Sequence, residues 1–290
     1  MGLSEFLQTS EFLHSVPHLT PDQLSKHIRA RGEEWFRTAT DDLELIRHNL
    51  AYFGLDAGEE MVSRVVDNVI LHYFEKFLPF CGSAASYQAF LASSVDGKNL
   101  SVIREALSKG NGVLLASTHF GAVELIPPTL ALHNVPINAV LRFRTEQLSV
   151  AAHQRAAAMA SSGLFGPIRF IEIGKPGTAA ALDMAAVLRR REALLSMMDE
   201  KTEYSKAVPF LGKTIWGGAG LDRLVAFSSA PVSIFLVTML RMGEGSYRLD
   251  VDEIVQSNSG LVLALFDRFS EVVKRYPEQW YFVHEEIAEA

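Results

Sequence analysis

Short apolar runs alternate with helix-like stretches in the second part of the chain, and this alternation limits the possible folds. Four runs have the length and composition of buried strands: Val113–Ser117, Ile137–Leu141, Ile168–Ile173 and Ala193–Met198. A segment with helical character follows each run before the next strand begins. Strand–helix units of this kind form a mostly parallel sheet covered by helices on both faces. The sequence therefore predicts an α/β fold.

The helices expected between and after these strands are Gly121–Leu132, Glu146–Ser161, Thr178–Arg190 and Gly218–Ser228. Two later strands, Val232–Leu240 and Tyr247–Ile254, precede a last amphipathic helix, Leu261–Tyr276. In the first of the helices, Pro127 and Pro128 are expected to cause a kink, because proline lacks the N–H donor and clashes with the preceding turn.

The first hundred residues have helical patterns. Thr20 and Pro21 begin a helix with a hydroxyl cap and a proline at the first helical position. The glycine-rich stretch Lys109–Gly112 then interrupts the chain before the first strand. We expect a helical N-terminal region, residues 1–107, and an α/β core, residues 108–290, that together form one compact domain.

Composition narrows the class of protein. Of the 290 residues, 48% are hydrophobic and 21% are charged, which is typical of a globular chain. A net charge of −7 argues against a nucleic-acid partner, which favours a basic surface. The longest apolar run, Pro231–Leu240, is far shorter than the roughly 20 residues of a spanning helix, so membrane contact is expected to be peripheral at most. Cys81 is the only cysteine, which fits a reducing, cytoplasmic location.

A histidine and a glutamate lie where the first strand turns into a helix. Thr118–Glu124 reads THFGAVE and follows directly on the apolar run. A neutral imidazole acts as a general base most effectively when a carboxylate fixes its tautomer. His119 and Glu124 are too far apart for one helix face, but they can converge across a strand-to-helix turn. The spacing alone equally allows a capping glutamate beside a loop histidine.

The block Thr118–Glu124 resembles the H-x(4)-[DE] motif of the lysophospholipid-type acyltransferases. It is most similar to the branch with the bacterial lipid A late acyltransferases, which has glutamate in this motif. Further stretches resemble that branch in the same order: Arg47–Leu50 (RHNL), Val140–Phe143 (VLRF), Met197–Glu200 (MMDE), Val208–Lys213 (VPFLGK) and Tyr276–His284 (YPEQWYFVH). The resemblance thus covers most of residues 43–284.

This resemblance implies an enzyme that moves an acyl group from a thioester, on acyl carrier protein or coenzyme A, to a hydroxyl or an amine. His119 would be the general base and Glu124 the residue that orients it. Backbone N–H groups near the turn would hold the tetrahedral intermediate. The resemblance implies no metal ion, no permanently bound cofactor and no covalent enzyme intermediate.

Residues of the other blocks and of the helix after the second strand are expected to bind substrate. Arginine is suited to the phosphate of an acceptor or of a phosphopantetheine donor. Asp199 ends an apolar strand, where it would orient an arginine or the acceptor, or form a structural pair. The expected substrate-binding residues are Arg142, Arg155, Asp199, Gly212 and Lys213, with Arg144 as a further candidate cation.

Two departures from the branch affect the choice of acceptor. Asp199-Glu200 replaces the usual Asp-Gln, and Arg142–Glu146 (RFRTE) replaces the usual R-P-x-x-N. Both lie where the acceptor would be held, so they bear on the acceptor more than on the chemistry. The branch also begins with a membrane-spanning helix, for which this sequence has no counterpart.

Three interpretations stay open. The acceptor is a small molecule of a biosynthetic pathway, either free or bound to an acyl or peptidyl carrier protein, or it is a lipid. The lipid case would make the chain a peripheral membrane enzyme of the lipid A or phosphatidylinositol mannoside type. The third interpretation is a non-catalytic protein that binds acyl chains or a carrier protein. For a carrier protein, the expected docking residues are the cations Arg189–Arg191, Lys201 and Lys206.

Overall fold

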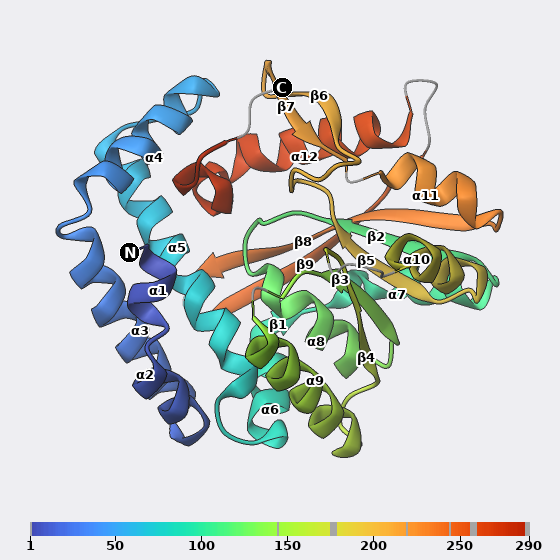
Figure 1. Cartoon of the computed structure of the whole chain (residues 1–290), viewed down its shortest axis with the longest axis horizontal. Helices are drawn as coiled ribbons and strands as arrows, with labels where there is room; N and C mark the ends of the chain where they lie inside the picture. The colour runs from blue at the N-terminus through green and yellow to red at the C-terminus, as the bar shows by residue number, and fades with distance from the viewer. Residues whose placement is uncertain are drawn as a thin grey trace.

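The computed structural model describes residues 2–143, 145–174, 179–218, 220–243, 245–255 and 260–287 (Figure 1). Within these residues a seven-stranded sheet lies between helices, and a two-stranded hairpin accompanies it. The sheet contains β1 (Val95–Asp96), β2 (Gly112–Ser117), β3 (Ile137–Leu141), β4 (Ile168–Glu172), β5 (Ala193–Met197), β8 (Val232–Gly243) and β9 (Ser246–Glu253). The hairpin contains β6 (Lys206–Phe210) and β7 (Lys213–Gly217). The predicted α/β class is confirmed.

The α-helices of the described residues are α1 (Leu3–Leu7), α2 (Ser10–Ser15), α3 (Pro21–Phe36), α4 (Thr40–Tyr52), α5 (Glu59–Phe77), α6 (Ala84–Ser94), α7 (Ser101–Ser108), α8 (Ile126–Leu132), α9 (Glu146–Ser161), α10 (Ala180–Arg189), α11 (Leu221–Ser228) and α12 (Leu261–Arg275). Short 3-10 helices are η1 (Val16–His18), η2 (Leu78–Phe80), η3 (Lys98–Leu100), η4 (Val123–Leu125), η5 (Pro277–Gln279) and η6 (Tyr281–His284). The helical character predicted for the first hundred residues is confirmed, although β1 lies within them.

The strand order of the sheet is β1-β9-β8-β2-β5-β3-β4, and all neighbouring strands are parallel except β8 and β9. β2 lies in the middle, where Leu115 pairs with Phe235 on one side and with Leu195 on the other. Every residue of β2 is buried. Because this strand is covered on both faces, it is apolar along its whole length instead of alternating.

Helices cover both faces of the sheet. The crossovers through α8 and α9 run in one direction across the sheet, and those through α10 and α11 run in the other. Because such crossovers are right-handed, the two pairs of helices lie on opposite faces. In Figure 1, α11 and α12 lie above the sheet, and α8 and α9 lie below it. The loops that follow β2, β5 and β3 meet at the carboxyl edge of the sheet.

The prediction of a kinked helix over Gly121–Leu132 was wrong. Val123–Leu125 forms η4, and α8 begins only at Ile126, so that Pro127 and Pro128 occupy its first turn. At the first helical positions proline lacks only an N–H that has no intrahelical partner, so it is tolerated without a kink. Glu124 therefore precedes the helix and does not lie in its first turns.

The N-terminal helices lie against the end of the sheet where β8 ends (Figure 1). α5 contacts η4, η5 and η6, and β1 pairs with β9, so residues 1–107 contribute a strand to the sheet. The Asn49 side chain of α4 donates hydrogen bonds to the backbone oxygens of Val283 and Glu285, at 2.9 and 3.0 Å. One continuous hydrophobic core extends from Leu3 to Val283.

Apolar residues of the first two helices belong to this core. Leu7 and Phe12 are buried, and Phe6 packs against Trp35. Contacts with the core thus account for Phe6, Leu7 and Phe12 of the N-terminal segment. None of the helices in the described residues combines the length and the apolar composition needed to cross a bilayer.

Candidate active site

The loop after β2 carries His119 and is held by two other parts of the chain. Gly121 N–H donates to the Gln279 backbone oxygen at 2.8 Å, and Ala122 N–H donates to that of Met239 at 2.7 Å. Gly121 has φ +57°, and a Cβ atom there would lie 2.0 Å from the Met239 oxygen. Only glycine allows β8 to approach the loop this closely.

The segment after α12 fixes the same loop from the other side. Tyr281 N–H donates to the His119 backbone oxygen at 2.9 Å. The Gln279 side chain bonds both backbone groups of Arg241 in β8, accepting from its N–H and donating to its oxygen, each at 2.9 Å. The Tyr276–His284 stretch of the sequence resemblance is therefore a clamp between β8 and the histidine loop.

His119 lies between two carboxylates from the end of β5. Its Nδ1 is 3.0 Å from Asp199 Oδ1, and its backbone N–H donates to Asp199 Oδ2 at 2.7 Å. Its Nε2 is 3.4 Å from Glu200 Oε1. The side chain of Asp199 is 1% exposed, whereas those of His119 and Glu200 are 21% and 43% exposed. The ring nitrogen that is available for chemistry is thus Nε2.

The electrostatic surroundings of His119 favour its protonated form. Burial by itself lowers the pKa of the imidazole, but this effect is outweighed by the charge and the hydrogen bond of Asp199. The charges of Glu200 and Glu124 act in the same direction, and together they raise the pKa of His119 to about 9. The carboxylates therefore stabilise an imidazolium at this position.

Glu124 does not make the orienting contact that the sequence predicted. In the described residues no hydrogen bond or ion pair joins it to His119, and Asp199 occupies that place. The hydrogen bonds of the loop to Met239 of β8 and to Gln279 place η4, which carries Glu124, against α5. Glu124 acts there through its charge: burial, followed by this charge, raises the pKa of Tyr87 in α6 well above its ordinary value.

The turn does not supply the expected oxyanion donors from residues 119–122. The N–H of Phe120 donates to the Thr118 oxygen, and those of His119, Gly121 and Ala122 donate as described above. All four of these donors already have partners, so they do not form the expected oxyanion hole.

Arg155 is partly buried and has unsatisfied donors. Its Nε and Nη2 atoms, like the hydroxyl of Tyr87, are buried and have no hydrogen-bond partner among the described residues. Burial lowers the pKa of Arg155, and the nearby Tyr87 and Cys81 oppose this only in part. Nε and Nη2 form the edge of a guanidinium that binds carboxylate or phosphate in a bidentate manner. Both atoms are buried in this structure, and a substrate-binding role for Arg155 stays a prediction.

Arg142 lies on the same edge of the sheet as His119 but not beside it. It follows β3, two strands away from β2, and its side chain is exposed. A Cβ atom on Gly174 would lie 2.9 Å from Arg142 Nε, so the guanidinium lies over this glycine. Arg144 lies outside the described residues.

Gly212 and Lys213 lie in the β6–β7 hairpin, which the sequence pattern had missed. Leu211 and Gly212 have φ values of +48° and +75°, as a two-residue hairpin turn requires. Lys213 Nζ lies 4.4 Å from the centre of the Tyr52 ring. The positive φ of Gly212 is sufficient to explain a glycine in this turn, without any contact to a substrate. Lys213 contacts Tyr52 of α4.

The expected docking cations are spread over both edges of the sheet. Arg189–Arg191 ends α10 directly before β5 and so lies at the amino edge, opposite His119. Arg190 pairs there with Glu192 at 3.2 Å. Lys206 pairs with Asp222, and Lys201 lies 5.4 Å from the centre of the Trp216 ring. Arg190, Lys201 and Lys206 thus have structural partners, and Arg189–Arg191 lies on the edge of the sheet opposite His119. Docking of a carrier protein at these cations stays a prediction.

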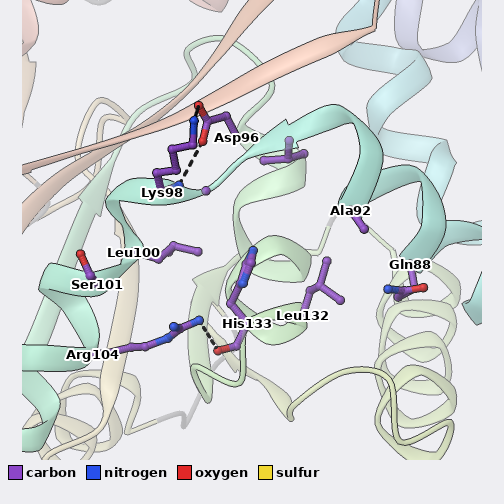
Figure 2. A pocket seen from close by; sticks show the side chains of 11 residues that line it. Gln88, Ala92, Asp96, Lys98, Leu100, Ser101, Arg104, Leu132 and His133 are labelled. Atoms are coloured by element: carbon purple, nitrogen blue, oxygen red, sulfur yellow. Dashed lines mark hydrogen bonds and ion pairs between the residues drawn. The ribbon is translucent and has the colours of Figure 1, made fainter.

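A groove of about 540 Å³ between α6, η3, α7 and the end of α8 contains none of these residues (Figure 2). Figure 2 shows that its charged groups already have partners: Lys98 lies 3.7 Å from Asp96, and Arg104 donates to the His133 backbone oxygen at 2.9 Å.

Sequence reasoning did not assign a role to Tyr87, Gln279 or Glu200. For Glu200 a signal existed, since it replaces the glutamine of the resembling branch beside Asp199. For Tyr87 of α6 the sequence offers no such signal, because the residue stands out only through its proximity to Arg155 of α9. Neither protein-family models nor curated protein sequences give a match to this chain.

Proposed function

We propose that the chain is an acyltransferase that moves an acyl group from a thioester to a hydroxyl or amine acceptor. The observation that carries the proposal is the arrangement of His119 at the carboxyl edge of a parallel sheet, with Nδ1 held by the buried Asp199 and Nε2 next to the more exposed Glu200. In open α/β sheets, ligands bind at this edge. A histidine oriented by a buried carboxylate is the usual general base of acyl transfer.

His119 Nε2 takes a proton from the acceptor, whose oxygen or nitrogen attacks the thioester carbonyl. Asp199 stabilises the imidazolium that forms, because its carboxylate accepts from Nδ1. The tetrahedral intermediate then collapses, the carbon–sulfur bond breaks, and the imidazolium returns the proton to the leaving thiolate. Asp199 thus takes the positioning role that the sequence gave to Glu124, while Glu124 adds negative charge nearby.

The donor in this proposal is an acyl or peptidyl carrier protein or coenzyme A, and the location is the cytoplasm, where such thioesters are made. The unpaired edge of Arg155 would receive a phosphate or carboxylate of a substrate. The membrane-surface alternative shares this chemistry and differs only in the acceptor.

A donor screen tests the proposal. The purified chain is incubated with acyl-carrier-protein and coenzyme A thioesters together with amine and alcohol acceptors, and mass spectrometry follows the acyl group. We expect transfer with at least one donor. His119→Ala should lower it by about 10³-fold or more, the loss typical of removing a base from such a unit.

His14→Ala is the matched control, because His14 is an exposed histidine on α2 and should leave transfer unchanged. Circular dichroism should show both variants folded. A His119→Ala variant that keeps most of the activity would exclude His119 as the base. A non-catalytic binding protein would retain the acyl carrier without any loss of thioester.

A further inference from the structure

The acceptor side of His119 carries an excess of negative charge. Asp199 at Nδ1 and Glu200 at Nε2 are two carboxylates for one imidazole, so the group is negative even when His119 is protonated. Glu124 adds its charge at longer range. Among the described residues, no lysine or arginine forms an ion pair with any of these three carboxylates.

This excess lies where an acceptor has to bind. The attacking atom must come within hydrogen-bond distance of Nε2, and Glu200 Oε1 is already 3.4 Å from that atom. The Glu200 side chain is 43% exposed, so a ligand reaches it without any opening of the core. An acceptor at Nε2 therefore lies next to the Glu200 carboxylate.

Aromatic rings complete the surroundings on the side of η6. The Phe282 ring centre is 4.8 Å from that of His119, and the Tyr281 ring centre is 6.3 Å from it. The faces of aromatic rings attract ammonium groups and do not attract anions. Both rings lie beside His119 and carry no charge, so the carboxylates determine the sign of ligand charge that this part of the site favours.

We propose that the acceptor is a primary amine, bound as its ammonium ion by Glu200, so that the enzyme carries out N-acylation. This inference rests on the acyltransferase function proposed above and names its acceptor class. An alcohol gains at most a hydrogen bond from Glu200, and an acceptor with a phosphate next to its nucleophile is repelled. An ammonium ion replaces the imidazolium as the partner of Glu200, which leaves His119 free to become neutral.

Neutral His119 removes one proton from the ammonium ion, and the amine nitrogen attacks the thioester carbonyl to form a carbon–nitrogen bond. The nitrogen loses a second proton to solvent as the intermediate forms the amide. The carbon–sulfur bond breaks, and the imidazolium protonates the thiolate. One ammonium ion and one thioester thus give one amide, one thiol and one released proton.

Two acceptors of the same length, hexylamine and hexanol, test the inference with a donor that the screen accepts. An amine is intrinsically the better nucleophile, so a faster reaction of hexylamine is not informative by itself. The informative quantity is the kcat/KM for hexylamine divided by that for hexanol, compared between the wild type and the variants. In Glu200→Gln this ratio should fall at least about tenfold, mainly through a higher KM for hexylamine, since one charge-assisted contact is lost. Glu200→Asp should retain part of the preference.

Glu203→Gln is the matched control. It removes the same charge from an exposed side chain of the same loop, and the ratio should stay at the wild-type value. If Glu200→Gln and Glu203→Gln change the ratio equally, the effect comes from the general field of the loop and the inference is wrong.

A binding measurement separates this inference from the proposed function. Hexylammonium chloride is titrated into the protein without any donor, and the imidazole signals of His119 are followed by NMR. We expect saturable binding to the wild type and at least about tenfold weaker binding to Glu200→Gln, with no effect of hexanol. Binding without transfer to any acceptor would keep the ammonium site and overturn the acyltransferase. Equal binding of hexylammonium to both proteins would overturn the ammonium site and leave the acyltransferase standing.

Discussion

Two arginines of this molecule differ in the hydrogen bonds of their buried guanidinium nitrogens: those of Arg241 have partners, and those of Arg155 do not. Arg241 in β8 donates from Nε and Nη2 to the two oxygens of Glu75, at 2.8 and 2.6 Å, and from Nη1 to Asn68. Arg155 in α9 has the same Nε and Nη2 edge buried without any partner among the described residues. A buried guanidinium is stabilised by a paired carboxylate and is unfavourable without one.

The paired arginine, Arg241, has a structural role. Arg241 and Glu75 join β8 to α5, and through Gln279 they also support the loop of His119. The charges of Arg241 and Glu75 neutralise each other within the fold. Arg155 has no such partner among the described residues, and a buried polar group without a partner calls for an explanation, such as a ligand that completes it.

The largest expected effect is on the free energy of unfolding, when the Glu75–Arg241 ion pair is broken. Glu75→Gln leaves the Arg241 guanidinium buried without a counter-charge and should lower the free energy of unfolding by about 3 kcal/mol or more. Asp252→Asn is the control, because Asp252 pairs with Arg268 on the surface, where an ion pair contributes about 1 kcal/mol or less. Urea denaturation of both variants measures the difference. Similar losses would show that the Glu75–Arg241 pair behaves like a surface pair.

The opposite result is expected for Arg155→Met. Methionine fills a similar volume without the unpaired donors, so the free energy of unfolding should stay within about 1 kcal/mol of the wild type or rise. Transfer activity should fall at least about tenfold, since a hydrogen-bonded ionic contact contributes about 1.5–3 kcal/mol. Denaturation and steady-state kinetics on one preparation test both parts. A large loss of stability with normal activity would make Arg155 structural, like Arg241.

The smallest effect concerns the pH dependence of transfer at His119. Since the pKa of His119 is raised to about 9, transfer by the wild type should increase with pH and level off near that value. In Asp199→Asn the largest cause that raises the pKa is removed, so the inflection should move down toward the ordinary value of 6.5. A pH–rate profile of each protein measures this shift. An unchanged inflection would mean that another group controls the profile.

The raised pKa of His119 also determines how the free energy of unfolding changes with pH. A histidine whose pKa is higher in the folded than in the unfolded state stabilises the fold fully below pH 6.5. This contribution is lost as the pH rises from 6.5 to about 9. Denaturation at several pH values should show the decline in the wild type and a weaker decline in His119→Ala.

Local sequence patterns predicted the strands better than they predicted the start of α8. A buried parallel strand has to be apolar along its length, so Val113–Ser117 and Ala193–Met198 could be recognised without neighbours. Pro127 and Pro128 were compatible with either a kink or a helix start, and the bonds of Gly121 and Ala122 to distant backbone decided for the start. The two-residue strand β1 is too short to leave a pattern.

The sequence by itself determined that a histidine ends a buried strand and that carboxylates end another. It did not determine which carboxylate meets the histidine. β2 and β5 are neighbours with Ser117 opposite Met197, so residues two positions further along, His119 and Asp199, also come face to face. Glu124 is closer in sequence, but β8 and Gln279 hold the intervening loop in another direction. Strand order and register are properties of the whole sheet, because they depend on which apolar surfaces are buried together, and only the tertiary structure decided them.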